Sequence, residues 1–156
     1  FSSREVPVSD ANPPFQPFAV KAEVVLDYFD GKDSKVDSMT KFEGVYRANQ
    51  GMDYSFNKEA FDVLASFSGE VSDVKEDNIF GKSVTITSKD LSITYQSLSD
   101  ITVKKGDKVN QKDPIAKAGS NIYNKELGNH LHIVVEKNGK IIDPELMYGK
   151  TNAEIK

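Results

Sequence analysis

The chain has 156 residues, 38% of them hydrophobic, and a formal net charge of −4. This length is enough for one domain with a buried core. Lysines are spread along the chain without a basic segment, which argues against a nucleic-acid partner. There is no cysteine, and no apolar run approaches the roughly 18 residues of a membrane-spanning helix. Composition leaves the cellular compartment open.

The first 17 residues predict an extended lead-in or linker. Pro7, Pro13, Pro14 and Pro17 lie in this stretch and forbid a continuous helix. The chain begins at Phe1 without a methionine, so we expect a processed or truncated fragment whose upstream signal or anchor is not seen here. We predict one domain over residues 18–148 and a C-terminal tail over 149–156.

Short segments rich in Val, Ile, Thr, Tyr and Phe recur between turn signals and predict a mainly antiparallel β protein with little helix. Asn138-Gly139 is a strong hairpin signal because both residues tolerate positive φ. Asp143 followed by Pro144 predicts at most a short terminal helical turn. The predicted strands are 22–29, 39–47, 52–56, 68–76, 82–88, 91–97, 114–118, 131–137 and 140–142.

His130 and His132 are the only histidines of the chain, and they lie within a predicted strand. Side chains at i and i+2 leave the same face of a strand, so both imidazoles are expected to point into one groove. A zinc hydrolase can present a ligand beside an acid/base in this way. A catalytic zinc usually takes three protein ligands, however, and the chain offers no cysteine and no further histidine. We interpret the pair as the remains of a metal site.

Residues 103–119, with a turn at Gly106-Asp107, resemble the β-hammerhead shared by lipoyl and biotinyl carriers and by lysostaphin-type zinc peptidases. Three motifs extend the resemblance to the LytM domain family. In active members, His-x-Gly-x-Asp supplies two zinc ligands, Tyr-x-His-Leu supplies a catalytic histidine, and His-x-His supplies a catalytic histidine and the third ligand. The matching segments here are Asn49-Gln50-Gly51-Met52-Asp53, Tyr95-Gln96-Ser97-Leu98 and His130-Leu131-His132. The resemblance implies a twisted antiparallel sheet of the LytM fold.

Two departures from these motifs predict a pseudoenzyme. Asn49 replaces a ligand histidine with an amide, a poor zinc ligand, which leaves Asp53 and His132 as the strong donors. Ser97 replaces a catalytic histidine and cannot act as a general acid, although its hydroxyl can donate one hydrogen bond. We therefore expect a vestigial metal pocket of Asn49, Asp53 and His132, vestigial catalytic positions at His130 and Ser97, and no zinc or other cofactor.

Each of these residues also has a purely structural interpretation. The histidines can line a groove with their hydrogen bonds satisfied, Asp53 can accept backbone N–H groups, and Ser97 can be an ordinary strand residue. Asn49 can occupy a left-handed turn before the motif glycine. The aromatic residues are expected in the core and groove wall, namely Phe42, Tyr46, Tyr54, Phe56, Phe61, Phe67 and Phe80.

Within LytM domains, four segments resemble the stage II sporulation protein Q group of endospore-forming bacteria: 95–99, 106–109, 118–123 and 128–132. The resemblance implies a membrane anchor upstream of Phe1 and a domain at the forespore outer surface, in the space facing the mother cell. Its implied partner is stage III sporulation protein AH, joined across the two membranes during engulfment in a channel-like ring. An exposed strand edge can make such a contact by strand addition.

Three functions remain open. The first is this non-catalytic scaffold or adhesion domain, whose interface strand we expect at 22–29 or 39–47. The second is a zinc-dependent peptidoglycan endopeptidase with weak residual activity, in which Asn49 serves as a weak ligand. The third is a LytM-type activator of a cell-wall amidase.

Overall fold

The computed structural model describes residues 13–31, 37–150 and 154–155, and this part of the chain is mainly β, as the sequence predicts. Strands and two short 3-10 helices follow one another in the order β1 (Glu23–Leu26), β2 (Met39–Phe42), β3 (Val45–Ala48), β4 (Met52–Ser55), β5 (Asp62–Leu64), β6 (Gly69–Asp77), β7 (Gly81–Ser88), β8 (Leu91–Ser99), β9 (Lys108–Val109), β10 (Pro114–Ala118), η1 (Lys125–Leu127), β11 (Leu131–Lys137), β12 (Lys140–Ile142) and η2 (Pro144–Leu146).

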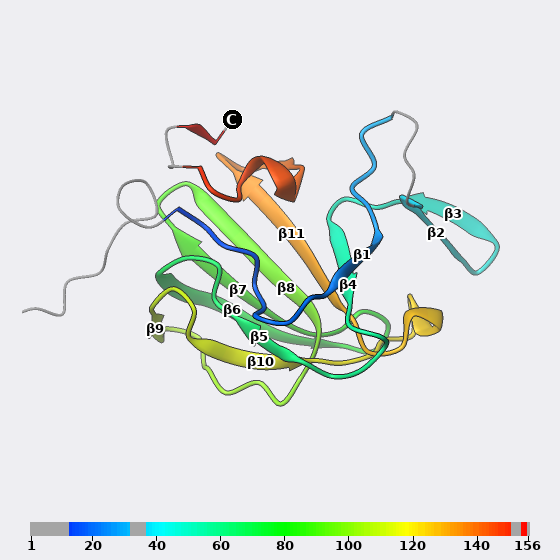
Figure 1. The fold of residues 1–156 in the computed structure, drawn as a ribbon, viewed down its shortest axis with the longest axis horizontal. Coiled ribbons are helices and arrows are strands. Elements are labelled where there is room, and N and C mark those ends of the chain that lie inside the picture. The colour runs from blue at the N-terminus through cyan, green and yellow to red at the C-terminus, as the bar shows by residue number, and fades with distance from the viewer. Residues whose placement is uncertain (1–12, 32–36, 151–153, 156) are drawn as a thin grey trace, which may run out of the picture.

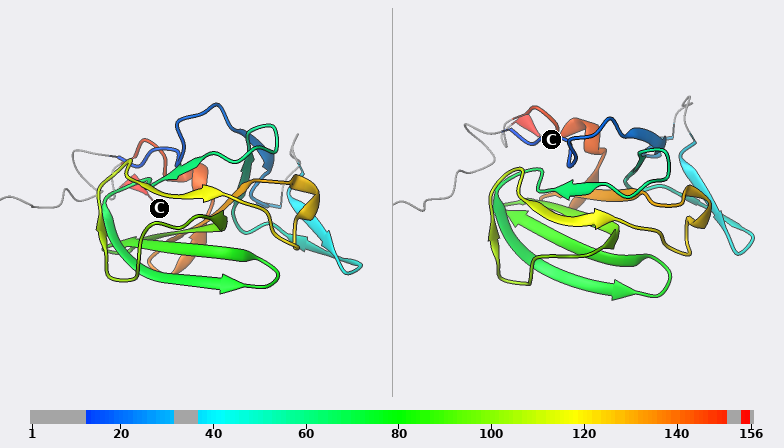
Figure 2. Two further views of the ribbon diagram at one scale, coloured as in Figure 1. Left: turned by 90° about the horizontal axis from the view of Figure 1, so that it is seen from below. Right: turned by 60° about the horizontal axis from the view of Figure 1, so that its bottom comes forward.

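One antiparallel sheet forms the body of the molecule (Figure 1). Its strands run in the order β1-β4-β11-β8-β7-β6-β9, and β10 pairs with both β8 and β5. Figure 2 shows β5 and β10 above β6 to β8, so the sheet turns back over its own face. The central position of β11, between β4 and β8, brings three distant parts of the sequence together.

The core fills the space inside this folded sheet, and β8 shows how the sequence produces it. Leu91, Ile93 and Tyr95 are fully buried, while the residues between them are partly exposed, which is the period of two expected of a strand. The Tyr95 hydroxyl accepts a hydrogen bond from the Ser66 N–H at 2.7 Å. Burial raises the pKa of Tyr95 to about 12, so this hydroxyl stays neutral.

Turn and cap signals in the sequence are confirmed where they are strong. Lys137 pairs with Lys140 around Asn138-Gly139, and both turn residues have positive φ. The Asp143 carboxylate caps η2 by accepting from the Glu145 N–H at 3.0 Å. In the described part of the chain, no helix has the length and apolar character needed to cross a membrane.

The predicted strand 39–47 is wrong, because this segment forms two strands. β2 and β3 make a separate two-stranded sheet joined by Glu43-Gly44, with φ of 51° and 79°. A turn with two positive φ values is usually marked by Asn-Gly or Asp-Gly, and glutamate carries no such signal. The β2–β3 hairpin projects from one end of the body (Figures 1 and 2). Tyr46 on β3 is 65% exposed, so it belongs to neither core nor groove wall.

The predicted lead-in lies mostly outside the described residues, and the domain bounds of 18 and 148 stay a prediction. Residues before 18 and after 148 also pack against the domain. The Phe15 N–H donates to the Ser66 carbonyl at 3.0 Å, and the Pro17 carbonyl accepts from the Leu64 N–H at 2.9 Å. Ile155 is 2% exposed and belongs to the core.

Gly51→Ala is expected to destabilise the fold by at least about 3 kcal/mol, because an added Cβ would overlap the backbone carbonyl of Ile133 on β11. Urea unfolding measures this change. Gly44→Ala is the control: open space surrounds Gly44, so only its positive φ is penalised, by about 1 to 2 kcal/mol. Equal losses for the two variants would contradict the close packing of β4 on β11.

Candidate functional site

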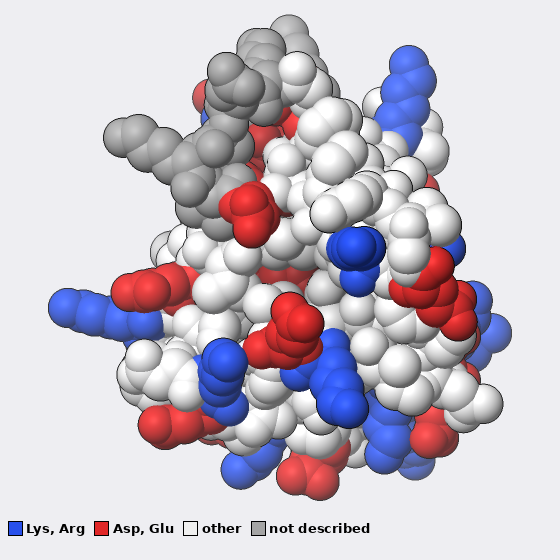
Figure 3. All heavy atoms as spheres, turned by 90° about the vertical axis from the view of Figure 1, so that its right-hand side faces the viewer, with Lys and Arg blue, Asp and Glu red and all other residues white. Residues whose placement is uncertain are grey.

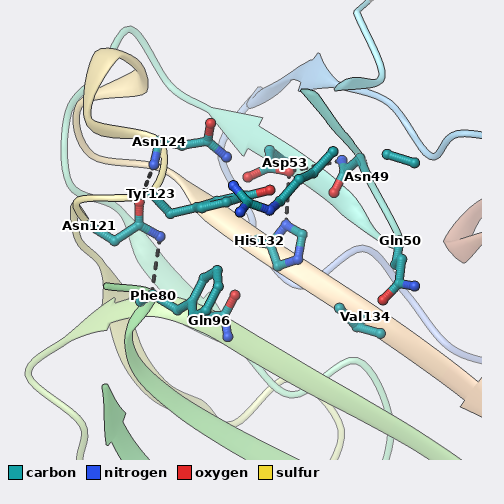
Figure 4. A pocket seen from close by; sticks show the side chains of 12 residues that line it. Asn49, Gln50, Asp53, Phe80, Gln96, Asn121, Tyr123, Asn124, His132 and Val134 are labelled. Carbon is teal, nitrogen blue, oxygen red and sulfur yellow. Dashed lines mark hydrogen bonds and ion pairs between the residues drawn. The ribbon is translucent and has the colours of Figure 1, made fainter. Parts of the chain in front are cut away.

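A cleft of about 530 Å³ opens beside β4, β8 and β11, at the end of the sheet nearest the β2–β3 hairpin (Figure 4). Amide, aromatic and charged side chains line it, and they come from five separate parts of the chain. The lining residues are Arg47, Ala48, Asn49, Gln50, Asp53, Phe80, Gln96, Asn121, Tyr123, Asn124, His132 and Val134.

The Asp53 carboxylate is the centre of this site. Asp53 lies on β4 directly opposite His132 on β11 and is fully buried. The His132 Nδ1 lies 2.8 Å from Asp53 Oδ1, and because a carboxylate only accepts, Nδ1 carries the hydrogen. Burial lowers the pKa of His132, but the charge of Asp53 and this hydrogen bond outweigh burial and leave the pKa raised. The sheet register therefore builds a charge-assisted pair.

Asn49 donates to the same carboxylate oxygen. Its Nδ2 lies 3.0 Å from Asp53 Oδ1 and 3.1 Å from the Asp27 carbonyl, and its Oδ1 accepts from the Gly51 N–H at 3.4 Å. These neighbours fix the direction of the amide, because a flipped amide would turn its oxygen toward two acceptors and its NH₂ toward a donor. Asn49 thus presents hydrogens, and no lone pair, to Asp53.

His130 precedes β11 and approaches the other oxygen of Asp53. Its Nδ1–H donates to the Gly128 carbonyl at 2.8 Å, and its Nε2 lies 3.6 Å from Asp53 Oδ2. Neither Nε2 nor Oδ2 has a hydrogen-bond partner within the described structure. Burial lowers the pKa of His130, which favours the neutral ring. The predicted i, i+2 geometry brings both imidazoles to Asp53, but His130 is fully buried and does not line the cleft.

Ser97 also lies away from the cleft lining. It is fully buried, and its Oγ donates to the Gly119 carbonyl at 3.0 Å, which also accepts from the His130 N–H. Ser97 has φ of 67°, a value that breaks the regular alternation of β8. Gln96, which pairs with His132 across β8 and β11, lines the cleft instead. Neighbouring side chains of a strand point to opposite faces, and this alternation beside Ser97 is the sequence signal that could have identified Gln96.

The far wall of the cleft contains Phe80, one of the aromatic residues expected in the core and groove wall, together with Asn121, Tyr123 and Asn124, which the sequence analysis did not assign to the site. Phe80 lies in the β6–β7 turn, and its ring lies 4.9 Å from that of Tyr123, centroid to centroid. Asn121 donates through Nδ2 to the Phe80 carbonyl at 3.1 Å and accepts from the Asn124 N–H at 2.8 Å. This wall joins two loops distant in sequence, and no local pattern marks their contact.

The donor set does not fit a catalytic zinc as it is arranged. The cleft-side oxygen Asp53 Oδ1 already accepts from both Asn49 and His132. An imidazole can change its tautomer to offer a lone pair, but an amide nitrogen has none to offer. Across residues 13–31, 37–150 and 154–155, no group of three or more His, Cys, Asp or Glu side chains is placed to hold a metal ion.

Asn49→Ala is expected to destabilise the chain by about 1 to 3 kcal/mol, because it removes a buried donor from Asp53 Oδ1 and from the Asp27 carbonyl. Thermal and urea unfolding measure the loss. Exposed Asn110 gives the control: Asn110→Ala should stay within about 0.5 kcal/mol of the parent. An Asn49→Ala variant as stable as the parent would refute the stabilising role of this amide.

Comparison with known proteins places these observations in a family. The pattern of peptidase family M23 matches residues 47–144, which include all three motifs. Stage II sporulation protein Q of Bacillus subtilis (strain 168) is 36% identical over 115 residues, a match that covers 72% of this chain and 41% of that protein. The chain therefore spans less than half the length of this curated relative.

Solved structures agree. A chain from the SpoIIQ–SpoIIIAH pore-forming complex superposes with a TM-score of 0.85 at 31% identity, covering 92% of this chain and 95% of that one. The catalytic domain of lysostaphin from Staphylococcus simulans shares the fold, with a TM-score of 0.56 at 23% identity over 79% of this chain and 86% of that one. Motif order, antiparallel fold and family pattern agree, and the chain belongs to peptidase family M23.

Proposed function

We propose that this chain is a non-catalytic scaffold domain of sporulation that binds SpoIIIAH, the stage III sporulation protein AH. The similarity to a chain of the SpoIIQ–SpoIIIAH complex supports the choice of partner, because it extends over nearly the full length of both chains. The relative from Bacillus subtilis supports the sporulation setting. In this proposal the domain lies at the forespore outer surface, anchored by an upstream membrane segment of the full-length protein, and joins its partner across the intermembrane space during engulfment.

One observation carries the non-catalytic part of the proposal: two N–H groups occupy the oxygen of Asp53 that faces the cleft. Asn49 and His132 both donate to it, so hydrogen bonds take the place that metal bonds would need. The motif position at Ser97 adds a second loss, because its hydroxyl is committed to the Gly119 carbonyl outside the cleft. A zinc-dependent endopeptidase needs both a metal and an acid/base here.

The first test measures binding of this chain to the extracytoplasmic domain of SpoIIIAH by isothermal titration calorimetry, beside a zinc titration of the metal-free chain. We expect saturable binding to SpoIIIAH and no zinc heat. Zinc binding that His132→Ala abolishes would overturn the non-catalytic assignment. Capture of a cell-wall amidase without binding to SpoIIIAH would favour the activator function instead.

Asn49→His is expected to create zinc binding, because an imidazole would supply the missing third ligand beside Asp53 and His132. Zinc should then raise the melting temperature, and His132→Ala in the same background should remove that shift. Peptidoglycan hydrolysis should stay near background in Asn49→His, since Ser97 provides no imidazole. Strong hydrolysis by this single variant would contradict the role assigned to the loss at Ser97.

A further inference from the structure

We propose that the outer edge of β3 receives an extended, acidic segment of the partner as an added strand. The inference rests on the proposed function and names the surface through which the domain would bind. The surface is the β2–β3 hairpin, residues 39–48, which projects beyond the folded sheet (Figures 1 and 2).

Exposure distinguishes this hairpin from the other strands. All four residues of β3 are exposed, and the apolar side chains of Met39, Val45 and Tyr46 are 44%, 52% and 65% exposed. In the described structure β3 pairs with β2 and with no other strand. A two-stranded hairpin is marginally stable by itself in water, and a third strand would cover its apolar residues.

Contacts with the body hold the hairpin in place. At its base, the Asn49 carbonyl accepts from the Phe29 N–H at 2.9 Å. The Thr40 hydroxyl donates to Asn124 Oδ1 at 3.0 Å, and the Phe42 and Tyr123 rings lie 5.2 Å apart. The edge is therefore positioned before a partner arrives, which lowers the ordering cost of binding.

The backbone of β3 offers the groups that a new strand needs. Phe42 and Val45 flank the two-residue turn, and Thr40 faces Arg47. In an antiparallel pair, alternate residues bond inward, so Val45 and Arg47 bond toward β2 while the N–H and C=O groups of Tyr46 and Ala48 face outward. These outward groups are two residues apart and match the repeat of a single added strand.

Charge indicates the chemistry of that strand. Lys41 and Arg47 against the single Glu43 give the hairpin a formal charge of +1, whereas the whole chain carries −4. Lys41 lies over the Tyr46 ring and Arg47 over the Phe42 ring, so both cations flank aromatic surface. Figure 3, the side from which the hairpin projects, shows acidic and basic residues interspersed around uncharged surface. Apolar side chains alternating with carboxylates would complement this edge.

The far half of β6 is one competing edge, and its composition argues against it. β9 covers Gly69 and Glu70, which leaves 72–77 without a second neighbouring strand in the described structure. This stretch carries Asp73, Lys75, Glu76 and Asp77, and Lys75 pairs with Asp73 at 3.3 Å. Charged side chains along an edge oppose strand addition. β3 carries one charged residue, Arg47, beside three uncharged ones.

Hydrogen exchange tests the geometry on the unmodified chain. In complex with the SpoIIIAH extracytoplasmic domain, the amides of Tyr46 and Ala48 should gain protection, whereas those of Val45 and Arg47, already bonded to β2, should change little. Binding of SpoIIIAH without protection at Tyr46 and Ala48 would overturn this inference and leave the proposed function standing. Absence of SpoIIIAH binding would instead overturn the proposed function, and this inference with it.

Substitution tests the chemistry. Tyr46→Glu should weaken SpoIIIAH binding at least about tenfold, because it removes apolar surface and repels an acidic strand. The matched control is Ile141→Glu, at a residue of β12 that is 38% exposed, which should change binding less than about twofold. Equal affinities for both variants would refute the assignment of the surface. The edge could also be occupied by a second copy of this chain, and sedimentation of the chain alone tests this. Dimerisation that protects the amides of Tyr46 and Ala48 would assign the edge to the second copy and overturn the proposal.

Discussion

The site depends on one buried carboxylate and the two N–H groups that satisfy it. Asp53 Oδ1 accepts from Asn49 and His132, and this pair of bonds ties the segment before β4 to β11 at the middle of the sheet. Burying a carboxylate without hydrogen-bond donors costs free energy of folding, so the stability of this site requires both the carboxylate and its donors. The same two hydrogen bonds also stabilise the fold around the carboxylate.

The other oxygen of Asp53 shows what this arrangement leaves unsatisfied. Oδ2 faces the lone pair of a neutral His130, and neither atom has a hydrogen-bond partner in the described structure. Buried polar groups without partners are rare in proteins and often mark a site that once served, or still serves, a purpose other than stability. The mismatch therefore lies among the motif residues of a chain that belongs to peptidase family M23.

Sequence patterns predicted the parts of the fold that depend on local chemistry. Alternation at Leu91, Ile93 and Tyr95 predicted β8, and Asn138-Gly139 predicted its hairpin. The resemblance to the LytM motifs implied that Asn49, Asp53 and His132 lie together, and the structure brings both partners to the Asp53 carboxylate. Other features depend on distant backbone: the Asp27 carbonyl sets the direction of the Asn49 amide. The positive φ of Ser97 moves its side chain off the cleft, and a serine at that position does not predict a positive φ.

The tilted rings of Phe42, Tyr123 and Phe80 contact one another in series, and this has a mechanical consequence. Phe42 belongs to the β2–β3 hairpin, whereas Tyr123 and Phe80 form the wall of the cleft, and neighbouring centroids lie 5.2 and 4.9 Å apart. A load applied to the hairpin is therefore transmitted to the mouth of the cleft through direct ring contact. The projecting hairpin and the cleft are therefore mechanically connected, and a force on one would reach the other through these rings.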